Sequence, residues 1–278
     1  TWGFDKKAGQ IDYLWGPWTS KGENGNSNVL ESGVSKICTI SDGYFAAIKI
    51  DGSVVVWGWG PAGVWLQEED PDVIRFDEIS NQLSSDVVNI FSTGRAAAAL
   101  KSDGSVVTWG EKISGGDSNS VISQISGDVI SISTNAYSFA ALKSDGSVVT
   151  WGRNARGGDS SLVSNHLSSG VQKIYGSRDT FAALKNDGSV ISWGQYQSIS
   201  DMGSVTNSWN SVKDQLSNGV IDVVHNGQSD AWAALKSDGS VVTWGRNDLG
   251  GDSTKVMGPD WMLNGTKSGD QLSNGIVA

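Results

Sequence analysis

The stretch ALKSDGSVVTWG, residues 99–110, occurs three times in this chain of 278 residues, and its other copies lie at 141–152 and 234–245. Asp-Gly and Trp-Gly recur at the same spacing in two less regular copies. A second marker, Leu-Ser-x-Gly-Val or a close variant, opens units near residues 30, 83, 125, 167, 216 and 272. Six units of about 42 residues or more follow from either marker, and such repetition is the strongest available signal of architecture.

Each unit contains three short β-strand patterns, as the copy at 170–194 illustrates. Residues 170–177 alternate between polar and apolar, and 180–188 and 188–194 form two further runs. Asp-Gly between the last two is typical of a tight hairpin whose two central residues both take positive φ. The run SVVTW is apolar on both faces, which indicates a sheet covered on both sides.

Three or four short strands per unit, stacked face to face, predict an all-β protein with the β-propeller fold. We expect a single domain over residues 1–278 with six blades, or seven if one blade lies outside this chain. Residues 270–278 repeat the opening of a unit, and residues 1–29 contain a degenerate hairpin that would complete it. Pairing of the N- and C-terminal strands is therefore expected to close the ring.

The stretch ALKSDGSVVTWGRNDLGGDS, residues 234–253, resembles the repeat of the regulator of chromosome condensation family. That pattern runs from Ala-Leu through Asp-Gly and Trp-Gly to Asn and a glycine-rich turn. Several units here are shorter than the family repeat, Gly-Gly-Asp-Ser replaces Gly-Gln-Leu-Gly, and six units replace the typical seven. The resemblance implies a propeller but no single function, because the family includes an exchange factor, a photoreceptor and interaction modules.

Composition excludes several classes of partner. The net charge is −10 and the pI is near 4.6, which argues against binding to nucleic acid or to anionic membranes. No apolar run approaches the roughly 20 residues of a membrane span, so we expect no membrane insertion. Cys38 is the one cysteine, so no disulfide forms within the chain. Low charge favours a secreted, surface or organelle-lumen protein, and a start at Thr1 without a signal peptide suggests a processed chain or part of a longer one.

The sequence contains no recognisable catalytic or metal motif. His166 and His225 lie apart from any nucleophile motif and are interpreted as structural. Asp117, Asp159 and Asp252 recur in Gly-Gly-Asp-Ser, where we expect each carboxylate to accept backbone N–H bonds of the turn instead of binding calcium. We therefore predict no enzyme activity, no cofactor and no metal, although two of the 30 acidic residues could form a hydrolase pair.

Tryptophans divide into two groups. Those of the repeat, such as Trp109, and Trp232 in a strand position are expected to pack in the core. Three units are enlarged after Trp-Gly, at 59–82, 195–215 and 254–271, and these segments carry tryptophans outside the repeat pattern. In the first unit Trp18 also follows the Trp-Gly pair. The candidate binding residues are therefore Trp18, Trp59, Trp65, Trp209 and Trp261.

Three functions remain in order of preference. The first is a non-catalytic interaction module, or a structural or linker subunit, that binds a protein partner through the face bearing the enlarged segments. The second is a glycan-binding lectin or surface adhesion domain that uses the five candidate tryptophans. The third is a hydrolase built on an unrecognised carboxylate pair.

Overall fold

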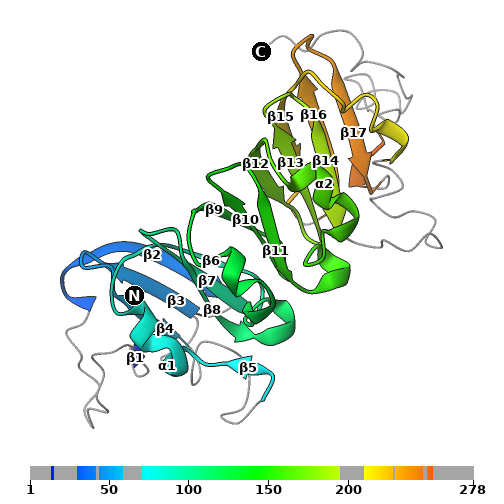
Figure 1. Cartoon of the computed structure of the whole chain (residues 1–278). Coiled ribbons are helices and arrows are strands. Elements are labelled where there is room, and N and C mark those ends of the chain that lie inside the picture. The colour runs from blue at the N-terminus through cyan, green and yellow to red at the C-terminus, as the bar shows by residue number, and fades with distance from the viewer. Residues whose placement is uncertain are drawn as a thin grey trace, which may run out of the picture.

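The computed structural model describes residues 14–15, 30–41, 44–58, 71–194, 210–227, 229–246 and 249–252. Within these residues the chain forms antiparallel sheets that follow one another in a row in chain order (Figure 1). We name them blades 1 to 5. Blade 1 has strand order β1-β4-β3-β2 and blade 2 has β5-β8-β7-β6, whereas blades 3 to 5 have three described strands each.

The strands have these bounds: β1 Leu14–Trp15, β2 Val34–Ser41, β3 Tyr44–Lys49, β4 Val54–Gly58, β5 Val73–Ile74, β6 Val87–Ser92, β7 Ala96–Lys101, β8 Val106–Glu111, β9 Val129–Thr134, β10 Ser138–Lys143, β11 Val148–Gly152, β12 Val171–Gly176, β13 Thr180–Lys185, β14 Val190–Gly194, β15 Val220–His225, β16 Ala231–Lys236 and β17 Val241–Gly245. β1 pairs with β4 at the edge of blade 1, as β5 pairs with β8 in blade 2. The predicted three-strand unit is therefore confirmed in every described blade.

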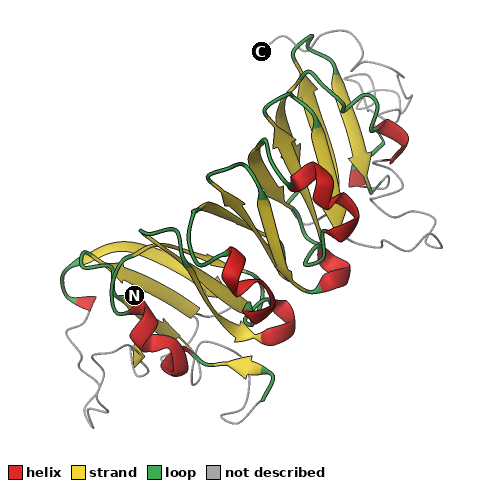
Figure 2. Ribbon diagram, in the orientation of Figure 1, coloured by secondary structure: helices red, strands yellow, loops and turns green. Residues whose placement is uncertain are grey.

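Short helices link the blades and lie along one side of the row (Figure 2). Their bounds are α1 Phe76–Ile79, η3 Ser80–Leu83, η4 Lys112–Ser114, η5 Asn119–Gln124, η6 Asn154–Arg156, η7 Ser161–Val163 and α2 Ser164–Leu167. None of the helices in the described ranges has both the length and the apolar character that crossing a membrane requires. The fold is thus all-β, with helical turns confined to the connections.

The Asp-Gly turns differ from the sequence prediction. Gly104 has φ of 80°, but Asp103 keeps a negative φ. The Gly104 N–H donates to the Lys101 carbonyl at 3.0 Å, which makes a type I turn followed by a left-handed glycine. The Asp103 carboxylate accepts the Ser105 N–H at 2.9 Å and the Ser105 hydroxyl at 2.6 Å. The expectation of positive φ at both residues was therefore wrong. Asp103 stays in the negative-φ part of the turn and stabilises it through its side-chain carboxylate, and only the glycine takes a positive φ.

Four of the Asp-Gly turns also hold the next blade. The Gly104 carbonyl accepts the N–H of Val129, the first residue of β9, at 3.1 Å. A Cβ at Gly104 would lie 2.6 Å from the backbone nitrogen of Asp128, so a larger residue would push blade 3 away. The same hydrogen bond joins Gly52 to Val87, Gly146 to Val171 and Gly188 to Val220.

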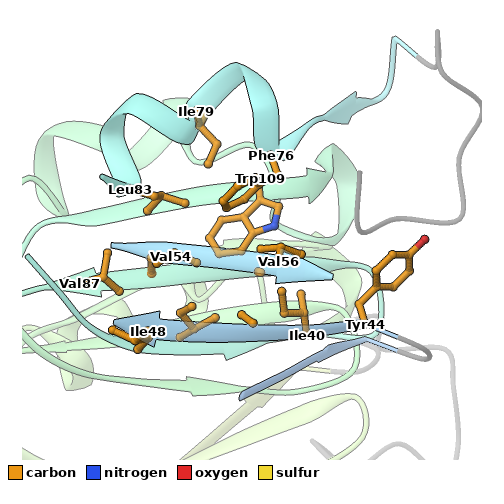
Figure 3. Close-up of a cluster of buried hydrophobic side chains, with 14 residues drawn as sticks. Ile40, Tyr44, Ile48, Val54, Val56, Phe76, Ile79, Leu83, Val87 and Trp109 are labelled. Atoms are coloured by element: carbon orange, nitrogen blue, oxygen red, sulfur yellow. The ribbon is translucent and has the colours of Figure 1, made fainter. Parts of the chain in front are cut away.

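The hydrophobic core lies between neighbouring blades. In blade 3, Phe139 and Trp151 face blade 2, whereas Ala140 and Leu142 face blade 4, as expected for strands that are apolar on both sides. Figure 3 shows Trp109 of blade 2 lying between helix α1 and strand β4 of blade 1. The predicted propeller-type stacking is thus confirmed for the described blades.

Blade 1 exposes a face that the other blades bury. Ile37 is 64% exposed, whereas Ile90 at the same position of blade 2 is 6% exposed. Phe45 is 41% exposed although it stacks on Trp57 at 5.6 Å, and its counterpart Phe139 is fully buried. A closed ring would cover this face with a further blade. The predicted pairing of the terminal strands falls outside the described residues and stays a prediction.

If the ring is closed, truncating Phe45 should lower the stability as much as truncating a core phenylalanine does. If a further blade covers this face in solution, we expect Phe45→Ala to lower the free energy of unfolding by about 3 kcal/mol, the cost of a core phenylalanine. Denaturant unfolding of Phe139→Ala supplies the matched buried reference. A Phe45→Ala cost below about 1 kcal/mol, with the full cost at Phe139, would show that the face is open.

The Asp-Gly turns predict acid sensitivity. Hydrogen bonds, first from the hydroxyl and then from the backbone N–H of the serine two residues on, lower the pKa of five aspartates: Asp51, Asp103, Asp145, Asp187 and Asp238. Because the folded pKa lies below the unfolded one, these groups stabilise the fold fully above about pH 4 and lose that effect as the pH falls through the folded pKa. We expect the free energy of unfolding, measured by denaturant titration, to fall below about pH 4.

Variants identify these aspartates as the source. In Asp103→Ala/Asp145→Ala the loss of stability below about pH 4 should be shallower than in the wild type, since two of the hydrogen-bonded carboxylates are gone. Asp214→Ala is the control, because this exposed side chain makes no hydrogen bond among the described residues. An unchanged acid slope in the double variant would contradict the assignment.

Candidate interaction surface at the Trp-Gly end of the blades

One end of every blade is defined by the Trp-Gly pair that closes its third strand, and we call it the Trp-Gly end. The second strand begins there and the first strand ends there, because the strands are antiparallel. The enlarged segments 59–82 and 195–215 directly follow Gly58 and Gly194 at this end, and the segment 254–271 comes later in the chain, after Gly245 and residues 246–253. The candidate binding residues Trp18, Trp59, Trp65, Trp209 and Trp261 lie outside the described residues, so their role stays a prediction.

Part of the first enlarged segment belongs to the fold. Residues 71–83, expected to be a loop, contain β5, α1 and η3. Val73 pairs with Glu111, and the Phe76 ring meets Trp109 edge-on at 5.8 Å. This stretch completes the covering of the Trp109 side chain, which is fully buried.

The repeat tryptophans are packing residues, as predicted. Trp109, Trp151, Trp193 and Trp244 are at most 2% exposed, and so is Trp232. Two of them also bind the preceding blade through the indole N–H, which donates to a carbonyl of the glycine-rich turn there. These hydrogen bonds join Trp151 to Gly115 and Trp193 to Gly157, each at 3.1 Å. Their indoles are therefore committed to the blade interfaces.

The aspartates of Gly-Gly-Asp-Ser support the turn interpretation. Asp117 accepts the N–H of Asn119 at 2.9 Å, and Asp159 accepts that of Ser161 at 2.8 Å. Each carboxylate thus holds the turn that leads into the next helix. Among the residues that the structure describes, no three His, Cys, Asp or Glu side chains gather in a way that could hold a metal ion.

Loops of successive blades are joined by hydrogen bonds at the Trp-Gly end. The Gly94 N–H donates to the Ala136 carbonyl, and the Ala136 N–H donates to the Arg178 carbonyl, both at 3.0 Å. The Asp179 N–H continues the series to the Asp230 carboxylate of blade 5 at 2.9 Å. The loops therefore form one continuous, firmly held edge across blades 2 to 5.

This edge carries a group of cationic and aromatic side chains, which we call the arginine rim. Its members come from blades 2, 3 and 4. Two guanidinium groups lie over the Tyr137 ring, that of Arg153 at 5.0 Å and that of Arg156 at 5.6 Å from its centroid. The rim consists of Arg95, Tyr137, Arg153, Arg156 and Arg178.

The carboxylates near the rim are buried beneath it. Arg156 forms an ion pair with Asp179, whose side chain is 5% exposed. Burial raises the pKa of Asp179; Arg156 opposes this effect and nearby Asp230 adds to it. Asp230 is itself buried and its carboxylate accepts the Thr180 hydroxyl at 2.9 Å. Arg95, which is 62% exposed, pairs at 3.0 Å with Glu111, which is 16% exposed.

The surroundings of His225 support the structural role predicted for this residue. Its ring packs against Trp232 with centroids 5.1 Å apart, and its buried Nδ1 atom has no hydrogen-bond partner among the described residues. Burial lowers the pKa of His225, and Asp230 opposes that effect. The ring is therefore held as a neutral packing group beside the buried carboxylates. His166 lies in helix α2, where its backbone carbonyl accepts the Lys185 ammonium at 2.8 Å.

Blades of this kind, stacked through tryptophans of a sequence repeat, define a propeller-type repeat protein. Residues 129–157, most of blade 3, match the regulator of chromosome condensation (RCC1) repeat. The predicted resemblance to that repeat family is thereby confirmed. No curated protein sequence matches the chain.

Solved propeller structures give weaker likenesses. The CRINKLY WD40 ectodomain of the Arabidopsis thaliana receptor kinase ACR4 has 17% identity and a TM-score of 0.40, over 74% of this chain and 66% of that one. Human WBSCR16 has 14% identity and a TM-score of 0.44, over 78% of this chain and 63% of that one. Prp20p of Saccharomyces cerevisiae has 16% identity and a TM-score of 0.44, over 86% of this chain and 62% of that one. The structure of Prp20p was described together with its binding to Gsp1p and histones.

The aligned part spans less than two thirds of each of these structures. No TM-score reaches 0.5, so the fold assignment rests on the blades themselves and on the matched repeat.

The ion pair between Arg156 and Asp179 predicts that the stability lost on removing the arginine depends on pH. We expect Arg156→Ala to lower the free energy of unfolding by about 3 kcal/mol at neutral pH, because the buried Asp179 carboxylate loses its cation. A group whose folded pKa is raised holds its proton more tightly when folded, so the penalty should grow as the pH rises from about 4 to 7. Denaturant unfolding across that range measures it.

The control for this prediction is an exposed ion pair. Arg75 lies 3.2 Å from Asp77, and both side chains are more than a third exposed. Arg75→Ala should cost less than about 1 kcal/mol with little pH dependence. Equal, pH-independent costs in the two variants would show that Asp179 is not a buried, strained carboxylate.

Proposed function

We propose that this chain is a non-catalytic interaction module, or a linker subunit of a larger assembly, that binds a protein partner through the Trp-Gly end of its blades. The observation that carries the proposal is the continuous hydrogen-bonded edge of that end. A preordered edge loses little conformational entropy on binding, which favours its use as a docking surface.

The side chains at this end support a protein partner. Arginine and tyrosine are enriched in the energetically dominant parts of protein interfaces, and the arginine rim presents both from three adjacent blades. The enlarged segments 59–82 and 195–215 start from the same end, and they carry the candidate tryptophans Trp65 and Trp209. Rim and tryptophans would thus contribute to one surface.

The titratable groups described near this surface support a non-catalytic role. Asp179 and Asp230 are buried in ion pairs and hydrogen bonds, and His225 is packed against an indole. Each group is engaged in holding the loops, whereas general acid–base catalysis requires groups that reach a substrate.

Partner capture from the native source tests the proposal. The wild-type chain should co-elute with one protein at fixed stoichiometry, measured by size exclusion with light scattering. Trp65→Ala/Trp209→Ala/Trp261→Ala should lose that partner, since truncating interface tryptophans removes the largest contacts. Asn186→Ala, at the exposed opposite end, should retain it.

Two outcomes would contradict the proposal. A wild-type chain that remains monomeric in native extracts has no partner of the expected kind. Saturable binding to a glycan array that the triple tryptophan variant loses, without any bound protein, would instead favour the lectin alternative.

A further inference from the structure

Arginines are unevenly distributed in this acidic chain. It has six, of which Arg95, Arg153, Arg156, Arg178 and Arg246 all lie in loops at the Trp-Gly end. The lysines of the repeated Leu-Lys-x-Asp-Gly stretch lie at the opposite end, for example Lys143 and Lys185. The guanidinium groups thus concentrate at the Trp-Gly end, where Lys112 is also exposed, and the planar guanidinium is the cation suited to paired hydrogen bonds with carboxylates.

The rim presents positive charge outward although the chain as a whole is negative. Arg178 is exposed and Arg153 is half-buried, whereas Asp179 and Asp230 below them are buried. Among the described residues neither Arg153 nor Arg178 forms an ion pair with a carboxylate. The charge of Arg178 opposes the rise in the pKa of nearby Asp179, but no direct ion pair among the described residues occupies its guanidinium.

The geometry of Arg153 is prepared for a ligand. Its guanidinium lies over the Tyr137 ring at 5.0 Å, a cation–π contact that fixes the plane of the group. Among the described residues the N–H groups of this guanidinium make no side-chain hydrogen bond, so the contact leaves them available to a ligand. Hydrogen bonds from Ala136 to Arg178 hold the two loops in fixed relation.

We propose that the arginine rim binds an acidic peptide segment of the protein partner, with side-chain carboxylates accepting hydrogen bonds from Arg153 and Arg178. The inference rests on the proposed function, because it names the chemistry that the Trp-Gly end recognises. Stacked sheets lie about 10 Å apart and an extended chain advances about 3.3 Å per residue. A peptide in the polyproline II conformation advances about 3.1 Å per residue with three residues per turn, so carboxylates three residues apart would lie on one side and meet successive blades.

A defined peptide tests this inference directly. The probe is a fluorescein-labelled peptide of Glu-Ser-Ser repeats, about twelve residues long, which exceeds the span of three blades. Fluorescence anisotropy with the full chain should show saturable binding that weakens as salt is added. The same peptide with Gln in place of Glu should not bind, since neutral amides give weaker hydrogen bonds to guanidinium.

Matched variants separate the rim from general electrostatic attraction. Arg153→Ala/Arg178→Ala should weaken peptide binding at least about tenfold, as expected when charge-assisted hydrogen bonds are removed. Lys143→Ala/Lys185→Ala makes the same change in net charge at the other end and should leave binding unchanged. An equal loss in both variants, or no binding by the wild type, would overturn the inference, and unchanged thermal unfolding confirms that both variants fold.

The two proposals fail in distinguishable ways. If the native partner is lost in the triple tryptophan variant but retained in Arg153→Ala/Arg178→Ala, the interaction module stands and the acidic segment is excluded. If the peptide binds the rim while no native protein binds the chain, the recognition chemistry stands and the proposed function fails.

Discussion

The close contact between the glycine of each Asp-Gly turn and the next blade is the constraint on which the rest of the structure depends. The Gly104 carbonyl accepts the Val129 N–H, and its Cα lies too near the Asp128 backbone for any side chain to fit. In the copy at 141–152 Gly146 makes the same contact with Val171. At the other end of that copy Trp151 reaches back to the Gly115 carbonyl of the preceding blade. One stretch of sequence thus fixes both neighbours of its own blade, which explains why it recurs almost unchanged.

Contacts of this kind join only adjacent blades, so stability in such a protein is close to a sum over blades and interfaces. The apolar face of blade 1, with Ile37 64% exposed, shows what an interface loses when its neighbour is not in contact. A further blade in a closed ring would cover this face. This is the physical reason to expect closure, independent of the terminal sequences.

The sequence predicted the blades and the packing of Trp109, because large apolar side chains at a fixed repeat position have no other stable location. It did not distinguish the two turn types that Asp-Gly can form, since the choice depends on Ser105 binding the Asp103 side chain. It missed α1, although helical turns stand at the same place, before Ile125 and before Leu167, in the next two units. The arginine rim was also missed, because Arg95 and Arg153 occupy different positions in their units and only the stacking of blades aligns them.

The two ends of the blades differ in how far they can vary without loss of the fold. At the Asp-Gly end the interface requires glycine itself, so substitution would separate the blades. At the Trp-Gly end the loops are joined by backbone groups, as from Gly94 to Ala136 and from Ala136 to Arg178, and such bonds accept almost any side chain. Exposed side chains such as that of Arg178 can therefore change there at little cost, whereas Arg156, which pairs with buried Asp179, cannot. A propeller that diverged to bind a new partner would be expected to diverge at this end, which is where the arginines of this chain have gathered.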